Sequence, residues 1–278
     1  MTVADALRHA ARSLAGTSDS ARLDAELLMA EALGVGRSDL LLRRMGDPAP
    51  EGFAALIERR AAHEPVAYIV GRKAFYGRAF AVSRAVLIPR MDSEATVAAA
   101  LEACPEPRRV LDCGVGSGAL LLTVLAERPG AQGVGIDRSP DAVRAARGNA
   151  VALGLEGSCT IEQADWEERA WAEQLGRFDL IIANPPYVED DAPIEPDVRA
   201  WEPAGALFAG ADGLAGYHAL VPQLPALLEP GGVAVLEIGA SQFEAVADLA
   251  AKAGFNGELR RDLAGRPRAV ILRLGLGR

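Results

Sequence analysis

The chain has 278 residues, of which 50% are apolar and 24% charged, and this composition predicts a globular protein of roughly two domains. The net charge of -9 disfavours long-range attraction to a phosphate backbone, so direct binding of nucleic acid is not expected, while a basic protein partner is compatible with it. Three cysteines without ligand spacing indicate reduced thiols in a cytoplasmic protein. No apolar run reaches the roughly 18 residues that cross a membrane, and an N-terminus with Asp5 and Arg8 is unlike a signal peptide.

Residues 1–64 are expected to form a small helical bundle. Thr2 can cap a first helix, whose apolar face follows helical spacing at Val3, Ala6, Leu7, Ala10 and Leu14. A second helix is expected to end at Gly34, with its apolar face at Leu23, Leu27, Leu28 and Ala32. Further helices are expected over 39–45 and from Pro50 to a stop before Pro65. The block contains no catalytic cluster, so we interpret it as a domain for packing or substrate recognition.

Residues 65–87 are expected to form a β-hairpin that links the two halves of the chain. The spacing changes there from helical to alternating, with short strands expected at 68–70, 75–77 and 80–82. The run Leu87-Ile88-Pro89-Arg90 then leads into a helix that begins near Asp92.

Residues 88–278 alternate between strand and helix patterns. Strands are expected at 110–113, 133–136, 159–163, 178–183 and 233–238, and helices at 118–127, 140–153, 216–228 and 242–253. A terminal hairpin is expected at 258–260 and 269–274. This alternation predicts an α/β fold with a doubly wound, mostly parallel sheet, to which the hairpin adds an antiparallel strand.

A glycine-rich loop follows the first of these strands, with the sequence Gly114-Val115-Gly116-Ser117-Gly118. Glycines there allow the backbone to approach a ligand closely, and the N-terminus of the next helix offers free N–H groups. Asp137 ends the next strand about 20 residues further on, where a carboxylate can accept hydrogen bonds from ribose hydroxyls. Nicotinamide enzymes and enzymes that use S-adenosylmethionine share both features, so this pair predicts a bound cofactor without choosing between them.

A carboxylate and an indole end the third strand, at Asp165 and Trp166. Asp165 can accept a hydrogen bond from an adenine amino group. Trp166 can cover the base, or it can simply pack at the rim of the core.

The fourth strand ends in Asn184-Pro185-Pro186-Tyr187, called the tetrad below. Proline has a fixed φ and restricts the residue before it, so two prolines hold Asn184 and the neighbouring carbonyls rigidly. The Asn184 side-chain oxygen and the Pro185 carbonyl can each accept one hydrogen of a planar NH2 group, while Tyr187 lies against its plane. Hydride transfer needs no such arrangement, whereas methylation of a conjugated nitrogen does. We therefore expect an S-adenosylmethionine-dependent methyltransferase of Rossmann-like fold, with Asn184, Pro185 and Tyr187 as catalytic residues and S-adenosylhomocysteine as a product.

Nearly the whole chain resembles the HemK/PrmC-type methyltransferases, which modify the side-chain amide of glutamine in peptide-chain release factors. The resemblance lies in the stretches PVAYIVGRKAFYGRAFAV, VLIPR, LDCGVGSGALLL, GVGIDRSPDAVRAARGNA, FDLIIANPPYV, EPAGALFAGADGL, LEIGASQ and RDLAGRPRAV. It implies methylation of a glutamine in a GGQ-type loop, with release factors as protein partners. It also implies cofactor contacts at Gly114 to Gly118, Asp137, Trp166 and Asn184, and contacts to the glutamine at Asn184, Pro185, Pro186 and Tyr187.

The chain departs from the usual sequence of that family at three places. Met91-Asp92-Ser93-Glu94 stands where Pro-Glu-Thr-Glu is usual, and Ala204 stands where Glu-Pro-Arg places an arginine. Cys113 replaces an aliphatic residue, which is a conservative change in a strand. The roles of the missing side chains therefore cannot be transferred. Arg90 can position the cofactor's carboxylate or lie at a domain interface.

Two other classes of function share some of these features. An amine methyltransferase that acts on a nucleic-acid base is disfavoured by the net charge and by the absence of a Lys/Arg-rich run. A cofactor-binding scaffold without catalysis is disfavoured by the intact tetrad.

An acidic stretch follows the tetrad and can be a solvated loop or a surface that attracts a basic partner; it comprises Glu189, Asp190, Asp191, Glu195 and Asp197. His9, His63 and His218 show no ligand spacing, so no metal is expected. A monomer is expected.

Overall fold

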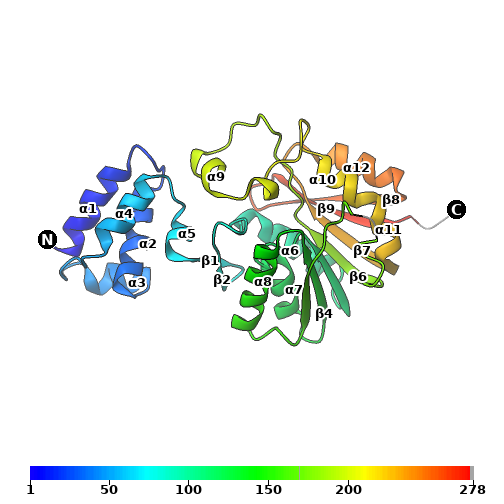
Figure 1. The fold of residues 1–278 in the computed structure, drawn as a ribbon, viewed down its shortest axis with the longest axis horizontal. Coiled ribbons are helices and arrows are strands. Elements are labelled where there is room, and N and C mark those ends of the chain that lie inside the picture. Colours follow the sequence, from blue (N-terminus) through cyan, green and yellow to red (C-terminus); the bar gives the residue numbers. More distant parts are fainter. Residues whose placement is uncertain (169, 276–278) are drawn as a thin grey trace. The chain divides into compact units, whose positions relative to one another are not determined.

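The computed structural model describes residues 1–168 and 170–275, and the chain forms two compact units (Figure 1). The helical unit consists of Met1–Arg72 and Ile194–Trp201, and the sheet unit of Lys73–Pro193 and Glu202–Arg278. Of the predicted domain 88–278, Arg169 and residues 276–278 lie outside the described part. No helix in the described part is both long enough and apolar enough to cross a membrane.

The helical unit begins with the helix that the sequence predicts. Its helices are α1 (Val3–Leu14), α2 (Ala21–Leu33), α3 (Arg37–Asp39), α4 (Phe53–Ala61), α5 (Val66–Val70) and α9 (Pro196–Trp201), and a π-helical turn, η1 (Leu40–Arg44), follows α3. Thr2 Oγ1 accepts the backbone N–H of Asp5 at 3.2 Å, and all five apolar residues of the predicted α1 face are buried. The cap and the apolar spacing therefore fix α1 locally.

The predicted apolar face of the second helix is partly wrong. Leu23 and Leu27 are 42% and 37% exposed, whereas Leu28 is buried. The inward face of α2 also carries Asp24, which is buried because it pairs with Arg60, with 2.7 Å between Arg60 Nε and Asp24 Oδ2. Because Asp24 is charged but occupies a core position, the spacing of the apolar residues alone does not reveal which face of α2 is buried.

Residues 68–70 were predicted as a strand and are instead helical, in α5. Pro65 precedes the helix, and Gly71 ends it in the left-handed conformation with φ 73°. Their β-branched and aromatic side chains indicate a strand, but Tyr68 and Ile69 are buried and Ile69 packs in the core of the helical unit. Packing outweighs the local preference here. The hairpin is shorter than predicted and consists of β1 (Arg72–Phe75) and β2 (Arg78–Ala81).

The sheet unit confirms the predicted doubly wound α/β architecture. Its strands are β3 (Arg109–Cys113), β4 (Gln132–Asp137), β5 (Cys159–Gln163), β6 (Phe178–Ala183), β7 (Leu228–Glu237), β8 (Phe255–Arg261) and β9 (Pro267–Leu274). They form one sheet in the order β5-β4-β3-β6-β7-β9-β8. The first five are parallel, and β9 and β8 add antiparallel pairs at one end, as the predicted terminal hairpin requires.

Helices cover both faces of this sheet (Figure 1). They are α6 (Glu94–Ala103), α7 (Ala119–Glu127), α8 (Pro140–Ala152), α10 (Ala215–Leu220), α11 (Leu224–Leu227) and α12 (Phe243–Lys252), with 3₁₀ turns η2 (Met91–Ser93), η3 (Ala204–Ala206) and η4 (Val221–Gln223). The helix predicted over 216–228 is interrupted at η4, because Pro222 and Pro225 lack backbone donors.

Successive residues of β6 pack in two separate hydrophobic cores. Leu180 and Ile182 of β6 pack with α6, α7 and α8, whereas Ile181 and Ala183 pack with α10 and α12. This alternation follows from the period of two in a strand and shows that β6 is buried on both faces.

Candidate active site

The sheet register brings the predicted loops to one edge. Cys113, the last residue of β3, lies opposite Ile136 on one side and Ala183 on the other. The glycine loop, Asp137 and Asn184 therefore leave three neighbouring strands at the same level. The order of strands reverses at this point, which is where open α/β sheets bind ligands.

The glycine loop is held by main-chain hydrogen bonds to the end of β4. The N–H groups of Gly114 and Val115 donate to Ile136 O at 2.9 and 2.8 Å. Gly116 has φ 52°, and a Cβ built there would lie 4.0 Å from Gly114 O, an ordinary contact distance. A Cβ on Gly114 would lie 3.2 Å from Trp166 Cη2, so this glycine is explained by the indole packed against it.

Asp137 joins the glycine loop to the start of α8. Its Oδ2 accepts the N–H of Gly116 at 3.0 Å, and its Oδ1 accepts the N–H of Ser139 at 2.9 Å. Burial raises the pKa of Asp137, and the two backbone hydrogen bonds oppose that rise. Each carboxylate oxygen retains a second acceptor position for a ligand hydroxyl.

Asp165 and Trp166 lie just after β5, the strand next to β4 in the sheet. Asp165 Oδ1 accepts the N–H of Glu167 at 2.9 Å, which fixes the carboxylate at the turn. Gln223 Nε2 donates to Trp166 O at 2.9 Å and holds the main chain there. Both side chains are half-buried and line the cavity described next.

A cavity of about 240 Å³ opens at this edge of the sheet unit. All predicted site residues line it except Gly118, Pro185 and Tyr187. Leu87, Pro89 and Arg90 also line it. The sheet edge therefore gathers Asn184 and the predicted cofactor contacts other than Gly118 around one cavity.

Asn184 is half-buried at the cavity wall. Within residues 1–168 and 170–275, its carboxamide has no hydrogen-bond partner. Pro185 behind it is buried and packs closely against the start of helix α10, since a Cβ on Gly216 would lie 3.1 Å from Pro185 Cβ. A polar side chain at a cavity wall without a partner in the described chain is available to a ligand.

Tyr187 is held at its hydroxyl by a carboxylate that the sequence analysis gave no role. The Tyr187 hydroxyl donates to Glu237 Oε1 at 3.4 Å, a long contact, and Thr96 Oγ1 donates to Glu237 Oε2 at 3.3 Å. Burial raises the pKa of Tyr187 to about 12. Burial also raises the pKa of Glu237. Glu237 belongs to the stretch LEIGASQ, but an isolated glutamate at the end of a strand does not reveal its partner.

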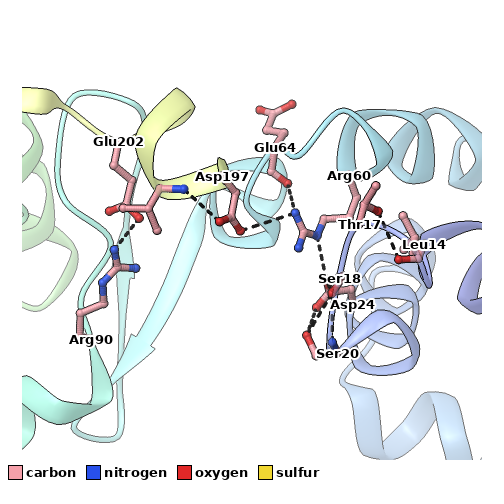
Figure 2. Close-up of polar contacts among 11 residues, drawn as sticks. Leu14, Thr17, Ser18, Ser20, Asp24, Arg60, Glu64, Arg90, Asp197 and Glu202 are labelled. Atoms are coloured by element: carbon pink, nitrogen blue, oxygen red, sulfur yellow. Dashed lines mark hydrogen bonds and ion pairs between the residues drawn. The ribbon is translucent and has the colours of Figure 1, made fainter. Parts of the chain in front are cut away.

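Arg90 is paired with Glu202, another residue without an assigned role from the sequence (Figure 2). The Arg90 Nη2 atom donates to Glu202 Oε1 at 2.6 Å, and the N–H of Ile88 donates to Glu202 Oε2 at 3.1 Å. The Glu202 side chain is 1% exposed. Glu202 thus fixes the segment 87–90, which contributes to the cavity lining, and the Arg90 side chain remains 35% exposed.

No group of three His, Cys, Asp or Glu side chains in the described residues could hold a metal ion.

Comparison with known proteins gives matches to both units. Residues 5–71 match the family model described as PrmC N-terminal domain, and residues 106–251 match the one described as Methyltransferase domain. A protein of Lactobacillus delbrueckii subsp. bulgaricus, described as ribosomal protein L11 methylase, has a solved structure with a TM-score of 0.50 and 21% identity, covering 69% of this chain and 83% of that one. That likeness shows the fold alone.

Sequence relatives are much more similar. The release factor glutamine methyltransferase of Cereibacter sphaeroides is 44% identical over 99% of this chain and 99% of its own length. The protein of the same name from Caulobacter vibrioides is 40% identical over 91% of this chain and 89% of its own length. The one from Moorella thermoacetica is 40% identical over 98% of both chains. Because these matches extend over nearly all of both chains, the chain belongs to the release factor glutamine methyltransferase family.

Proposed function

We propose that the chain transfers a methyl group from S-adenosylmethionine to the side-chain amide nitrogen of a glutamine in peptide-chain release factors. The observation that carries this proposal is the Asn184 carboxamide at the cavity wall, without a partner in the described chain, in a protein that matches release factor glutamine methyltransferases over its full length. The partners are thus the release factors, and the GGQ-type loop is the expected point of attack.

The cavity residues fit an S-adenosyl ligand. Asp137 can accept the ribose hydroxyls with the acceptor positions that its backbone bonds leave free. Asp165 and Trp166 line the same cavity and can receive the adenine amino group and ring. The absence of a side chain at Gly116 allows close approach to the loop backbone. Bound there, the cofactor supplies an activated methyl group on its sulfonium and leaves as S-adenosylhomocysteine.

The tetrad orients the substrate nitrogen. An amide nitrogen is a poor nucleophile because its lone pair is delocalised. If Asn184 Oδ1 and Pro185 O each accept one of its hydrogens, the nitrogen is aimed and its developing positive charge is stabilised. Fixed geometry of this kind contributes on the order of 7–11 kcal/mol to well-aligned reactions.

The proton balance needs no strong base. A methylated amide nitrogen that carries positive charge is strongly acidic, so it releases its proton to water without help from the chain. Tyr187 is proposed to lie against the plane of the glutamine amide. Its hydroxyl is engaged by Glu237, and its pKa of about 12 keeps the hydroxyl protonated at neutral pH.

Parallel methylation assays test this proposal. The protein is incubated with methyl-labelled S-adenosylmethionine and, separately, with release factor, tRNA or duplex DNA, and the labelled residue is located by mass spectrometry. We expect label on one glutamine of the release factor. Label on a nucleic acid alone would assign the chain to the base-modifying enzymes, and label on no substrate would favour a cofactor-binding scaffold.

A further inference from the structure

Gln242 connects three loops next to the tetrad. Its Nε2 atom donates to Tyr187 O and to Gly213 O, both at 3.1 Å. Its Oε1 atom accepts the N–H of Gly239 at 3.0 Å. Both amide hydrogens and one acceptor position are therefore used, and each contact is to the main chain of a different loop.

The loops around the Gln242 carboxamide are closely packed against it. Gly213 has φ 69°, and a Cβ there would lie 2.5 Å from Tyr187 O and 2.7 Å from Gln242 Nε2. A Cβ on Gly239 would lie 2.8 Å from Gln242 Oε1. The three loops are thus built closely around this carboxamide.

The Tyr187 carbonyl is at the end of the tetrad, and the next residue, Val188, is bonded to a segment that contributes to the cavity lining. The N–H of Val188 donates to Leu207 O at 2.9 Å, and Val188 O accepts the N–H of Ala209 at 2.9 Å. Ala209 lines the cavity. The Val188 N–H shares a planar peptide unit with the Tyr187 carbonyl, so its bond to Leu207 O orients this unit from one side, and Gln242 Nε2 holds the carbonyl oxygen itself.

We propose that Gln242 is a positioning residue for methyl transfer, which holds the Tyr187 carbonyl so that Asn184 Oδ1 and Pro185 O keep the spacing that a substrate amide requires. This inference rests on the proposed function. Gln242 acts through the tetrad and does not belong to the residues that line the cavity. Its loss should therefore affect the reaction step much more than cofactor binding.

Gln242→Glu is the sharpest variant, because it keeps the size and the acceptor to Gly239 while it places an oxygen against the carbonyls of Tyr187 and Gly213. A displacement of about 1 Å at a reacting centre costs about 100-fold in rate, so we expect kcat to fall about 100-fold. The Kd for S-adenosylmethionine, measured by calorimetry, should change by less than about threefold, a shift below 1 kcal/mol. Gln132→Glu, the same change at an exposed residue at the start of β4, should leave both quantities unchanged.

Gln242→Met is the second variant, because it keeps the length of the side chain without introducing a charge. It should show the same split between kcat and Kd even if the glutamate variant does not fold. A kcat within twofold of the wild type in Gln242→Met would overturn the inference. So would a proportional loss of cofactor affinity, which indicates a general structural role. An inactive wild type would instead refute the proposed function itself, and the inference with it.

Discussion

At the scale of single residues, the described chain satisfies some polar groups of the site and leaves others without a partner. Asp137 accepts two backbone N–H groups, and the Tyr187 hydroxyl contacts Glu237. Within the described residues, the Asn184 carboxamide has no such partner. The fixed groups shape the cavity, and Asn184 is where we expect a ligand to complete the hydrogen bonding.

Asp137→Asn should weaken S-adenosylmethionine binding by roughly 1.5–3 kcal/mol, the usual value of hydrogen bonds to a charged group. Burial raises the pKa of Asp137, so the wild-type affinity should begin to fall at a higher pH than an ordinary aspartate would cause, because only the carboxylate accepts both ribose hydroxyls. Calorimetric Kd values across acidic pH measure this. If the Kd of Asp137→Asn varied with pH in the same way as that of the wild type, Asp137 would not be the group whose protonation weakens cofactor binding.

At the scale of elements, the sequence predicts those parts whose buried residues are uniformly apolar. The strands β5 and β6 have the predicted bounds, because continuous apolar or alternating runs flanked by turns have few alternative structures. The edge where Gly114, Asp137 and Asn184 meet follows from the same pattern, since successive parallel strands end at one edge.

The elements that the sequence could not predict depend on distant partners. Asp24 occupies a core position of α2 because Arg60 pairs with it and Ser18 and Ser20 donate hydrogen bonds to it, and helix α9 was not predicted from the sequence. Glu202 fixes Arg90 across 112 residues, and Gln242 fixes Tyr187 across 55. The sequence around an isolated polar residue does not indicate a partner that is distant in the chain. These positioning contacts could therefore be found only in the structure.

Asp112 in β3 should make folding stability depend on pH. The residue is 1% exposed, its Oδ2 accepts the N–H of Leu121 at 3.2 Å, and burial raises its pKa from 3.8 to about 8. The folded state therefore holds a proton that the unfolded state releases near pH 3.8. The resulting stability is fully present below pH 3.8 and is lost as pH rises through about 8.

Asp112→Asn should remove this part of the pH dependence. Urea unfolding of the variant and the wild type across this range measures it, with the wild type losing more stability as pH rises. Parallel pH profiles would contradict the raised pKa.

At the scale of the whole molecule, the chain leaves the sheet unit after Pro193, joins the helical unit through α9, and returns at Glu202. Asp197 in α9 lies 3.7 Å from Arg60 Nη1, and Arg60 also pairs with Asp24 (Figure 2). Asp197 is thus part of an ion-pair network, although the acidic stretch to which it belongs was interpreted as a solvated loop or as a surface that attracts a basic partner. The sequence analysis interprets the helical block as a domain for packing or for substrate recognition, and the second of these roles stays a prediction.

Arg60→Met should destabilise the protein by about 3–5 kcal/mol, because it leaves the buried Asp24 carboxylate without its cation. Arg43→Met is the matched control: its side chain is 77% exposed beside Asp39, so the change should stay below about 1 kcal/mol. Urea unfolding followed by circular dichroism measures both. Equal effects would mean that the Arg60–Asp24 pair does not stabilise the helical unit, whereas recovery in Arg60→Met with Asp24→Leu would support the account.

The most direct test of the account is single-turnover methyl transfer to release factor by Asn184→Ala, together with its Kd for S-adenosylmethionine. We predict that the rate falls by about 100- to 1,000-fold, the usual loss when one preorganised hydrogen-bonding group is removed from a reacting centre, while cofactor affinity weakens far less. Methyl transfer at the wild-type rate by this variant would contradict the central claim that the tetrad orients the glutamine amide.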